Sequence, residues 1–291
     1  MSSKDLRLLV TGATGELGRL VVARLAEAHD PARVVALVRD PSRAQGLAAL
    51  GAEIRVANYD DPAALNAAFA GVDRALLISS SEVGRRVPQH RNVIDAAKAV
   101  NVSFLAYTSL LRADASPLAL AAEHLATERA IEASGLPFAL LRNGWYTENK
   151  TVSAPAALDH GAVLGCAGTG RFATASRQDY AEAAAAVLLA DDAPAGRTFE
   201  LAGDDAFTMA EFASEIGRLS GKPVIYRDLP EAEFRAALEA AGLPAPFAAL
   251  LADSDAGASK GGLYSERTDL SRLIGRPTTP WRRTLADAIA A

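Results

Sequence analysis

The feature that most constrains the fold of this 291-residue chain is the glycine-rich segment Thr11-Gly12-Ala13-Thr14-Gly15-Glu16-Leu17-Gly18. It follows an apolar run at residues 6–10 and opens a helical pattern at residues 15–28. Between a strand and a helix, the first glycine permits a tight turn, the second lets the backbone approach a pyrophosphate, and the third lets the helix pack closely. The helix N-terminus then offers free N–H groups and a positive dipole end to phosphates. The segment therefore predicts a dinucleotide-binding loop.

Strand and helix patterns alternate from this loop to about residue 150. Strands are predicted at residues 6–10, 33–38, 53–56, 75–78, 103–108 and 137–141, and helices at 15–28, 42–50, 62–69, 87–100 and 118–134. In the last of these helices, Ser116 and Pro117 suit the start and Gly135 suits a left-handed end. The alternation is typical of parallel βαβ units, and apolar strands without period-2 alternation indicate a sheet covered on both faces. The predicted fold class is α/β, a Rossmann doubly wound parallel sheet with a small C-terminal α/β lobe.

The regular alternation of strand and helix patterns ends at about residue 150. Short strands are predicted at residues 197–201 and 224–226, and helices at 208–219, 231–241, 244–251 and 280–290. We expect residues 1–150 to form an NADP-binding Rossmann domain, because an arginine, Arg39, follows its second strand. Residues 151–291 are expected to form a smaller substrate lobe, with some segments returning to the Rossmann domain.

Composition excludes several other classes of protein. The chain has 30 Lys and Arg against 35 Asp and Glu, without a cationic run, which argues against a nucleic-acid partner. Cys166 is the single cysteine, so no internal disulfide forms, a cytoplasmic location is expected, and the thiol is expected to be a small core residue. Four scattered histidines offer no metal-ligand cluster, and no apolar run is long enough for membrane insertion. The oligomeric state is left open, with a homodimer as one option.

The residue after the second strand distinguishes the two nicotinamide cofactors. NAD-binding proteins usually place an acidic residue there, about 20 residues past the loop, whereas NADP-binding proteins place an arginine near the 2′-phosphate. Here Arg39 follows Val38, and Arg43 lies one turn into the next helix. Asp40 complicates the pattern, but Asp40-Pro41-Ser42 is also typical of a helix start. The sequence therefore favours NADPH as the cofactor.

Polar and aromatic residues follow the later strands, where ligands of open α/β sheets bind. Ser79, Ser80 and Ser81 can hydrogen-bond a ribose or a nicotinamide amide. Asn143 offers a donor and an acceptor, Gly144 permits close approach, and Trp145 or Tyr146 offers a ring face to a planar substrate. The alternative is that the serines form an ordinary turn and that Trp145 and Tyr146 fill the seam between two lobes.

The Tyr-x-x-x-Lys motif of short-chain dehydrogenases is missing from the helix at residues 118–134, where Leu120 and His124 occupy its place. The same spacing occurs at Tyr146 and Lys150, but after the sixth strand, and we treat it as coincidental. Without that pair, an enzyme is poorly equipped to reduce simple ketones. It can still pass hydride to an acceptor that is already electrophilic, such as a quinone or a cationic dye, because positioning then does most of the work.

Four segments together resemble the atypical short-chain dehydrogenases, and within them the bacterial NAD(P)H:quinone oxidoreductases of the NmrA-like family, relatives of triphenylmethane reductase. They are the glycine loop, Ala36-Leu37-Val38-Arg39-Asp40-Pro41, Leu77-Ile78-Ser79-Ser80-Ser81-Glu82-Val83-Gly84 and Arg142-Asn143-Gly144-Trp145-Tyr146-Thr147-Glu148-Asn149. Residues 251–257 and 273–280 extend the likeness nearly to the C-terminus.

The resemblance implies an NADPH-binding Rossmann domain, a small C-terminal lobe and a quinone in the cleft between them. It assigns the pyrophosphate to Gly12, Ala13, Thr14, Gly15, Glu16 and Leu17, and the 2′-phosphate to Arg39. Ser79, Ser80, Ser81, Asn143, Gly144, Trp145 and Tyr146 would flank the nicotinamide. Asn143 and Tyr146 are the catalytic candidates, and the proton donor is either Tyr146 or an ordered water. Glu16 departs from the glutamine that these proteins often carry, which places a negative charge near the phosphates.

Three hypotheses follow. The first is an oxidoreductase that reduces quinones with NADPH. The second is an NmrA-like redox sensor that binds NADP(H) without turnover. The third is a reductase of cationic dyes, which Glu82 or Glu148 would favour if either lined the cleft.

Overall fold

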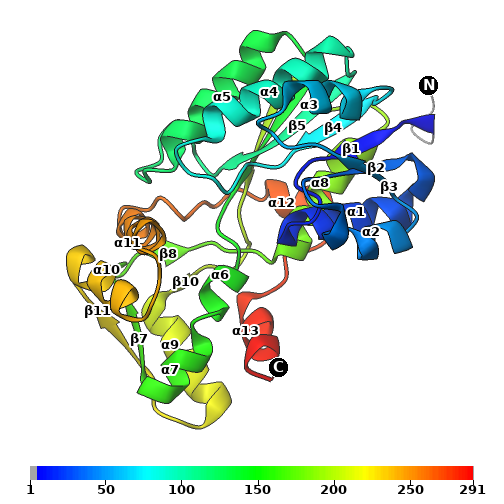
Figure 1. The fold of residues 1–291 in the computed structure, drawn as a ribbon. Helices are drawn as coiled ribbons and strands as arrows, with labels where there is room; N and C mark the ends of the chain where they lie inside the picture. Colours follow the sequence, from blue (N-terminus) through cyan, green and yellow to red (C-terminus); the bar gives the residue numbers. More distant parts are fainter. Residues whose placement is uncertain (1–4, 291) are drawn as a thin grey trace.

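The computed structural model describes residues 5–290 and is built around a seven-stranded parallel sheet (Figure 1). The strand order is β3-β2-β1-β4-β5-β6-β9, and every neighbouring pair is parallel. The strands are β1 (Leu8–Val10), β2 (Val34–Val38), β3 (Glu53–Val56), β4 (Arg74–Leu77), β5 (Phe104–Leu110), β6 (Phe138–Asn143) and β9 (Arg197–Leu201). This order reverses direction at β1 and β4, where a doubly wound sheet binds its ligand.

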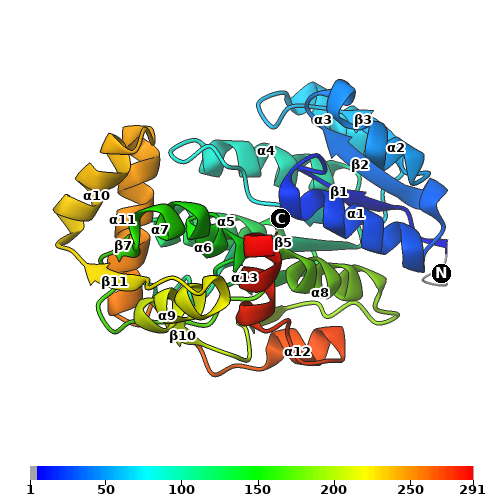
Figure 2. The same ribbon diagram turned by 90° about the horizontal axis from the view of Figure 1, so that it is seen from below.

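Helices cover both faces of the sheet (Figures 1 and 2). On one face lie α1 (Glu16–Ala28), α8 (Arg177–Leu189) and α12 (Asp269–Ile274), with α2 (Gln45–Ala49) beside them. On the other lie α3 (Pro62–Phe69), α4 (Arg86–Ala99) and α5 (Ala121–Ser134). Leu8 and Val10 point into the first core and Leu9 into the second, and all three are fully buried. The predicted two-sided sheet is therefore confirmed.

The second half of the chain contributes to both parts of the molecule. Its α8, β9 and α12 belong to the Rossmann sheet and its covering layer. The rest forms a small lobe (lower left in Figure 1) with two two-stranded sheets, β10-β8 and β11-β7. Phe172, Phe207, Phe212 and Trp281 stack in its core. The lobe comprises α6 (Glu148–Thr151), α7 (Ala154–His160), β7 (Ala162–Gly165), β8 (Arg171–Phe172), β10 (Phe207–Thr208), α9 (Met209–Ser220), β11 (Ile225–Asp228), α10 (Glu231–Ala240), α11 (Ala245–Ser259) and α13 (Trp281–Ala290).

The predicted start of α5 is wrong. The helix begins at Ala121 without a side-chain cap, and the Ser116 hydroxyl only accepts from the Leu118 amide. Residues 117–119 are held instead by α11, because the Ala119 N–H donates to Asp253 and Leu118 packs where Gly257 leaves no room for a Cβ. The predicted left-handed end at Gly135 is confirmed by its φ of 76°.

Two further local predictions need correction. The helix expected at residues 42–50 is divided into a short 3-10 turn, Pro41–Arg43, and α2. Cys166 is half-buried and not in the core, with its thiol donating to the Ala252 carbonyl. Burial and the neighbouring Asp255 raise the pKa of the Cys166 thiol to about 12, so the group is not a reactive thiolate at neutral pH.

Candidate functional site

A pocket of about 300 Å³ opens at the carboxyl end of the sheet, beside the switch point between β1 and β4. It is enclosed by the glycine loop, the end of β2, the segment after β3 and the loop after β4. The lining residues are Gly12, Thr14, Gly15, Leu37, Arg39, Arg43, Ala57, Asn58, Tyr59, Ile78, Ser79, Ser80, Ser81, Glu82 and Gln89.

The three glycines of the loop have distinct geometric roles. Gly12 has a φ of +59°, and its carbonyl accepts from the Gly15 amide at 2.9 Å, which closes the turn. A Cβ at Gly18 would lie 2.3 Å from the Gly12 oxygen, so α1 can approach the loop only with glycine there. Helix α1 begins at Glu16, and within residues 5–290 no side chain caps its first N–H groups. These donors are the ones that a pyrophosphate can use.

Tyr59 supports the glycine loop through hydrogen bonds, a role that was not predicted from the sequence. Its hydroxyl lies 2.5 Å from the Thr11 hydroxyl and 3.0 Å from the Ile78 carbonyl oxygen, and Thr11 also accepts from the Ile78 amide. These bonds join the ends of β1 and β4 to the segment after β3. The position of Tyr59 shortly after β3 was the sequence signal that could have indicated this role. Burial raises the pKa of Tyr59, which therefore stays protonated.

Arg39 reaches the pocket from the end of β2 and forms an ion pair with Glu82. The Arg39 Nη1 lies 2.8 Å from the Glu82 Oε1, and the arginine side chain is 62% exposed. Asp40 takes no part in this pair, because its carboxylate accepts from the Ser42 amide and hydroxyl. Asp40 therefore starts the 3-10 turn, as the Asp40-Pro41-Ser42 pattern predicts.

The loop of Ser79 to Ser81 is held by groups behind it. The Ser79 amide donates to the Thr108 hydroxyl, the Ser80 amide donates to His90 Nε2, and the Ser80 carbonyl accepts from Arg86. Because His90 Nε2 accepts, His90 Nδ1 carries the proton and donates to the Thr127 hydroxyl at 2.9 Å. Burial lowers the pKa of His90 to about 3, which keeps this histidine neutral.

The side chain of Ser80 is also engaged, because its hydroxyl donates to Gln89 and accepts from the Glu82 amide. Ser80 therefore shapes the loop, and Ser79 and Ser81 are the better candidates for direct contact with a ligand.

Asn143 and Tyr146 lie together at the end of β6. Asn143 is 5% exposed, and its Oδ1 is buried without a hydrogen-bond partner among the described residues. The Tyr146 ring packs edge-on against Tyr180 at 5.2 Å and beneath the Arg177 guanidinium at 5.0 Å. Burial raises the pKa of Tyr146, and Asn143 opposes part of this rise. A buried acceptor without a partner is costly, so Asn143 is a good candidate for a ligand contact.

Neighbouring residues in the segment from Asn143 to Tyr146 pack against different hydrophobic cores. Tyr146 packs against the Rossmann core, whereas Trp145 packs against the core of the small lobe. Gly144 donates to the Leu201 carbonyl at 2.8 Å, and a Cβ there would press on the Tyr180 hydroxyl at 3.0 Å. The segment thus forms the seam between the two parts and also borders the site, so the two interpretations of Trp145 and Tyr146 are compatible.

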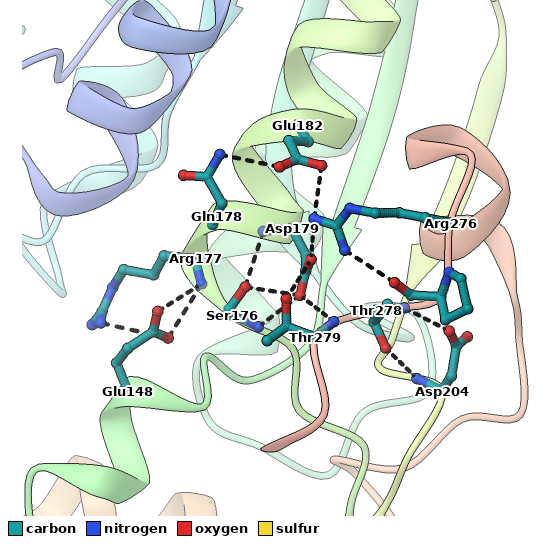
Figure 3. A network of polar contacts seen from close by, with 11 residues as sticks. Glu148, Ser176, Arg177, Gln178, Asp179, Glu182, Asp204, Arg276, Thr278 and Thr279 are labelled. Carbon is teal, nitrogen blue, oxygen red and sulfur yellow. Dashed lines mark hydrogen bonds and ion pairs between the residues drawn. The ribbon is translucent and has the colours of Figure 1, made fainter. Parts of the chain in front are cut away.

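A polar network at the start of α8 fixes this seam (Figure 3). Glu148 accepts from the Arg177 amide at 2.9 Å, which ties the segment after β6 to α8. The fully buried Asp179 forms a capping box with Ser176 and accepts from Thr279 and Arg276. The segment between α12 and α13 is therefore bound to α8, and this segment connects the two lobes.

Lys150 and His124, which the sequence places at the spacings of the Tyr-x-x-x-Lys motif, lie outside the site, and so does Glu128. Lys150 binds Asp255 in the small lobe and lies 4.4 Å from the centre of the Phe172 ring, which supports the view that its spacing from Tyr146 is coincidental. His124 binds Tyr107 and Arg86. Glu128 forms a buried ion pair with Arg142 at 2.8 Å and supports β6.

Comparison with known proteins agrees with this geometry. Residues 12–191 match the NAD(P)H-binding family. The chain belongs to this family. It is 54% identical to quinone oxidoreductase 2 of Escherichia coli (strain K12) over 97% of both chains.

Solved structures extend the likeness. The NADPH complex of the Escherichia coli NADPH-dependent quinone oxidoreductase superposes with a TM-score of 0.94 at 53% identity, over 97% of this chain and 99% of the other. Triphenylmethane reductase of Citrobacter sp. in complex with NADP(H) gives a TM-score of 0.93 at 35% identity, over 97% and 100%. The resemblance to atypical short-chain dehydrogenases related to triphenylmethane reductase is therefore confirmed.

The family fold brings part of the predicted site together around the pocket. Gly12, Thr14, Gly15, Arg39 and the serines line it. The side chains of Ala13 and Leu17 point into the core, so these residues can offer only backbone groups to a ligand. Asn143, Gly144, Trp145 and Tyr146 do not line this pocket and lie beyond it, at the end of β6.

The rest of the described chain adds two negative findings. Residues 5–290 contain no cluster of His, Cys, Asp or Glu that could hold a metal ion. Over the same residues, none of the helices combines the length and the hydrophobicity that a bilayer crossing requires.

Proposed function

We propose that this protein is an NADPH-dependent oxidoreductase that reduces quinones. The observation that carries the proposal is the glycine loop with Arg39 at one pocket, in a chain 54% identical to a quinone oxidoreductase over nearly its whole length. NADPH, when bound, supplies the hydride, and the quinone takes up that hydride and a proton to give the hydroquinone.

The residues of the chain fit such a cofactor. The uncapped N–H groups of α1 and the close approach at Gly18 suit a pyrophosphate held by Gly12, Ala13, Thr14, Gly15, Glu16 and Leu17. The Arg39 guanidinium matches a 2′-phosphate in bidentate geometry. Ser79, Ser80 and Ser81 on one side, with Asn143, Gly144, Trp145 and Tyr146 on the other, flank the nicotinamide. The unpartnered Asn143 Oδ1 can accept from a carboxamide N–H group.

The fold supports a division of roles between the two parts of the molecule. We assign cofactor binding to residues 1–150, and the acceptor side of the cleft to the smaller lobe of residues 151–291, with α8, β9 and α12 returning to the Rossmann sheet. Asn143 orients the ring, and Tyr146 donates the proton. Because burial raises its pKa, the Tyr146 hydroxyl is protonated at neutral pH and can act as a donor.

The alternatives have less support. The high identity to a quinone oxidoreductase favours turnover over a sensing role. A preference for cationic dyes would need an unpaired carboxylate at the cleft. However, Glu82 is held by Gln89 and Arg85 as well as by Arg39. Glu148 accepts from the Arg177 amide and forms an ion pair with its side chain.

The test is NADPH and NADH oxidation, side by side, with and without 1,4-benzoquinone. Quinone-dependent turnover that prefers NADPH is expected. Tight NADPH binding without quinone-dependent turnover would favour the hypothesis of a redox sensor instead.

The proposal includes a cytoplasmic location, supported by the single cysteine, and a quinone rather than a nucleic acid as the partner. Light scattering of the purified protein tests whether it forms a homodimer in solution.

A further inference from the structure

The adenosine end of the pocket contains a carboxylate as well as an arginine. Among the lining residues, Glu82 is the acidic one, and it comes from the loop after β4 rather than from the end of β2. Its Oε1 binds Arg39 at 2.8 Å, and its Oε2 accepts from Gln89 at 3.0 Å and from Arg85 at 3.4 Å. The Glu82 amide is bound by the Ser80 hydroxyl. The carboxylate is therefore held in place from α4, and it faces the group expected to bind a 2′-phosphate.

The two forms of the cofactor place opposite demands on this position. The 2′-hydroxyl of NADH is a hydrogen-bond donor that a carboxylate accepts well, which is why NAD-binding proteins place an acidic residue beside the ribose. The 2′-phosphate of NADPH is an anion that must take the place of the Glu82 carboxylate at Arg39 and then remain near it. The carboxylate of Asp40 cannot serve either purpose, because Ser42 occupies it.

We infer that Glu82 is a specificity-determining residue that supports NADH binding and lowers the affinity for NADPH through competition for Arg39. This inference rests on the proposed NADPH site and adds to it a second, opposing determinant. The wild-type protein therefore uses both cofactors, with a preference for NADPH that is smaller than Arg39 alone would give.

The experiment compares the dissociation constants of NADPH and NADH for the wild type and Glu82→Gln. The variant is expected to bind NADPH about two- to fivefold more tightly and NADH less tightly by a similar factor, which is the range of an exposed ion pair. Adenosine 2′,5′-bisphosphate and adenosine 5′-monophosphate, titrated in parallel, test the same position without the nicotinamide.

Asp60→Asn is the matched control. Asp60 lies in the same cluster, contacts Arg85 at 3.0 Å and Gln89 at 3.2 Å, and is not among the residues lining the pocket. Asp60→Asn removes one negative charge, as Glu82→Gln does, but it leaves the ion pair between Arg39 and Glu82 in place. An equal shift in both variants would mean a general charge effect and would overturn the inference.

A double-mutant cycle adds a second measurement. In an Arg39→Ala background, Glu82→Gln is expected to lose most of its effect on the 2′-phosphate. If the wild type binds NADPH through Arg39 but Glu82→Gln leaves the NADPH-to-NADH ratio unchanged, the role of Glu82 is refuted while the proposed function stands. If neither dinucleotide binds the wild type, both fail.

Discussion

Gly18→Ala is the substitution that tests most directly how the glycine loop works. The added Cβ would lie 2.3 Å from the Gly12 oxygen, 2.8 Å from the Ala13 Cα and 2.9 Å from the Gly12 carbonyl carbon. All three atoms belong to the backbone, so no side chain can rotate away. Ordinary contact begins at 3.4 Å, and the difference from 2.3 Å requires a movement of about 1.1 Å between α1 and the loop.

The expected cost has two parts. Overpacking against a rigid neighbour costs about 3 kcal/mol at the upper end of its usual range, and alanine in a helix regains about 1 kcal/mol over glycine. The free energy of unfolding should therefore fall by about 2 kcal/mol. Because we assign the phosphates of NADPH to both the loop and the helix N-terminus, a displacement of about 1 Å should lower kcat/KM for NADPH roughly 100-fold.

Urea unfolding and steady-state NADPH oxidation with 1,4-benzoquinone measure the two effects. Gly15→Ala, whose Cβ would lie 3.2 Å from the same oxygen, should give a smaller loss. Gly46→Ala is the control, because nothing lies within 4 Å of its Cβ and α2 should become more stable by up to about 1 kcal/mol. A Gly18→Ala protein with wild-type kcat/KM and wild-type unfolding would refute the argument from close approach.

Three further outcomes are expected. Arg39→Ala should weaken NADPH binding about tenfold, the lower end for a charge-assisted hydrogen bond, and leave NADH little changed; equal losses for both would exclude the 2′-phosphate role. Tyr146→Phe should keep its packing against Tyr180 and its NADPH affinity, but lower kcat for quinone reduction by about 100-fold, and an unchanged kcat would assign the proton to another group. Burial lowers the pKa values of His90 and His124 from 6.5 to about 3, so the unfolded chain binds more protons between these values and the folded protein loses stability as pH falls through this range. Urea unfolding at pH 8 and pH 5 should show a loss of about 1–2 kcal/mol per histidine, and a constant free energy of unfolding would contradict the assignment.

The Rossmann half was predictable because local signals and the overall fold agree there. The strand at residues 53–56 and the helix at residues 62–69 have the predicted bounds. The helix starts where predicted because Asp61 caps it and Pro62 opens it. The loop glycines and Arg39 also lie where their spacing places them, because each is fixed by the strand that precedes it.

The small lobe was less predictable because its elements depend on distant partners. β8 and β10 have two residues each and pair only with each other, and β7 pairs with β11 some sixty residues later. Helix α8 was missed because eight of its residues are buried, which removes the one-sided periodicity that predicts a helix. The sequence marked Glu82 as a candidate for the cleft, but it could not indicate the ion pair with Arg39, which comes from the end of another strand. The role of Tyr59 was missed because it depends on contacts with the ends of β1 and β4.

The two ends of the proposed site are built in opposite ways, which fits a site with a fixed geometry for hydride transfer and an adjustable preference between NADH and NADPH. Behind the end that we assign to the nicotinamide, His90, His124 and Tyr107 are buried, and their pKa values are moved away from neutrality. The loop of Ser79 to Ser81 in front of them therefore keeps one hydrogen-bond arrangement near neutral pH. At the adenosine end, Arg39 and Glu82 are partly exposed and bind each other through charge. Hydride transfer needs fixed distances, which favours neutral buried bonds over exposed ion pairs. A shift of up to about 1 kcal/mol changes the ratio of NADH to NADPH affinity about fivefold, and an exposed pair of opposite charges can supply such a shift.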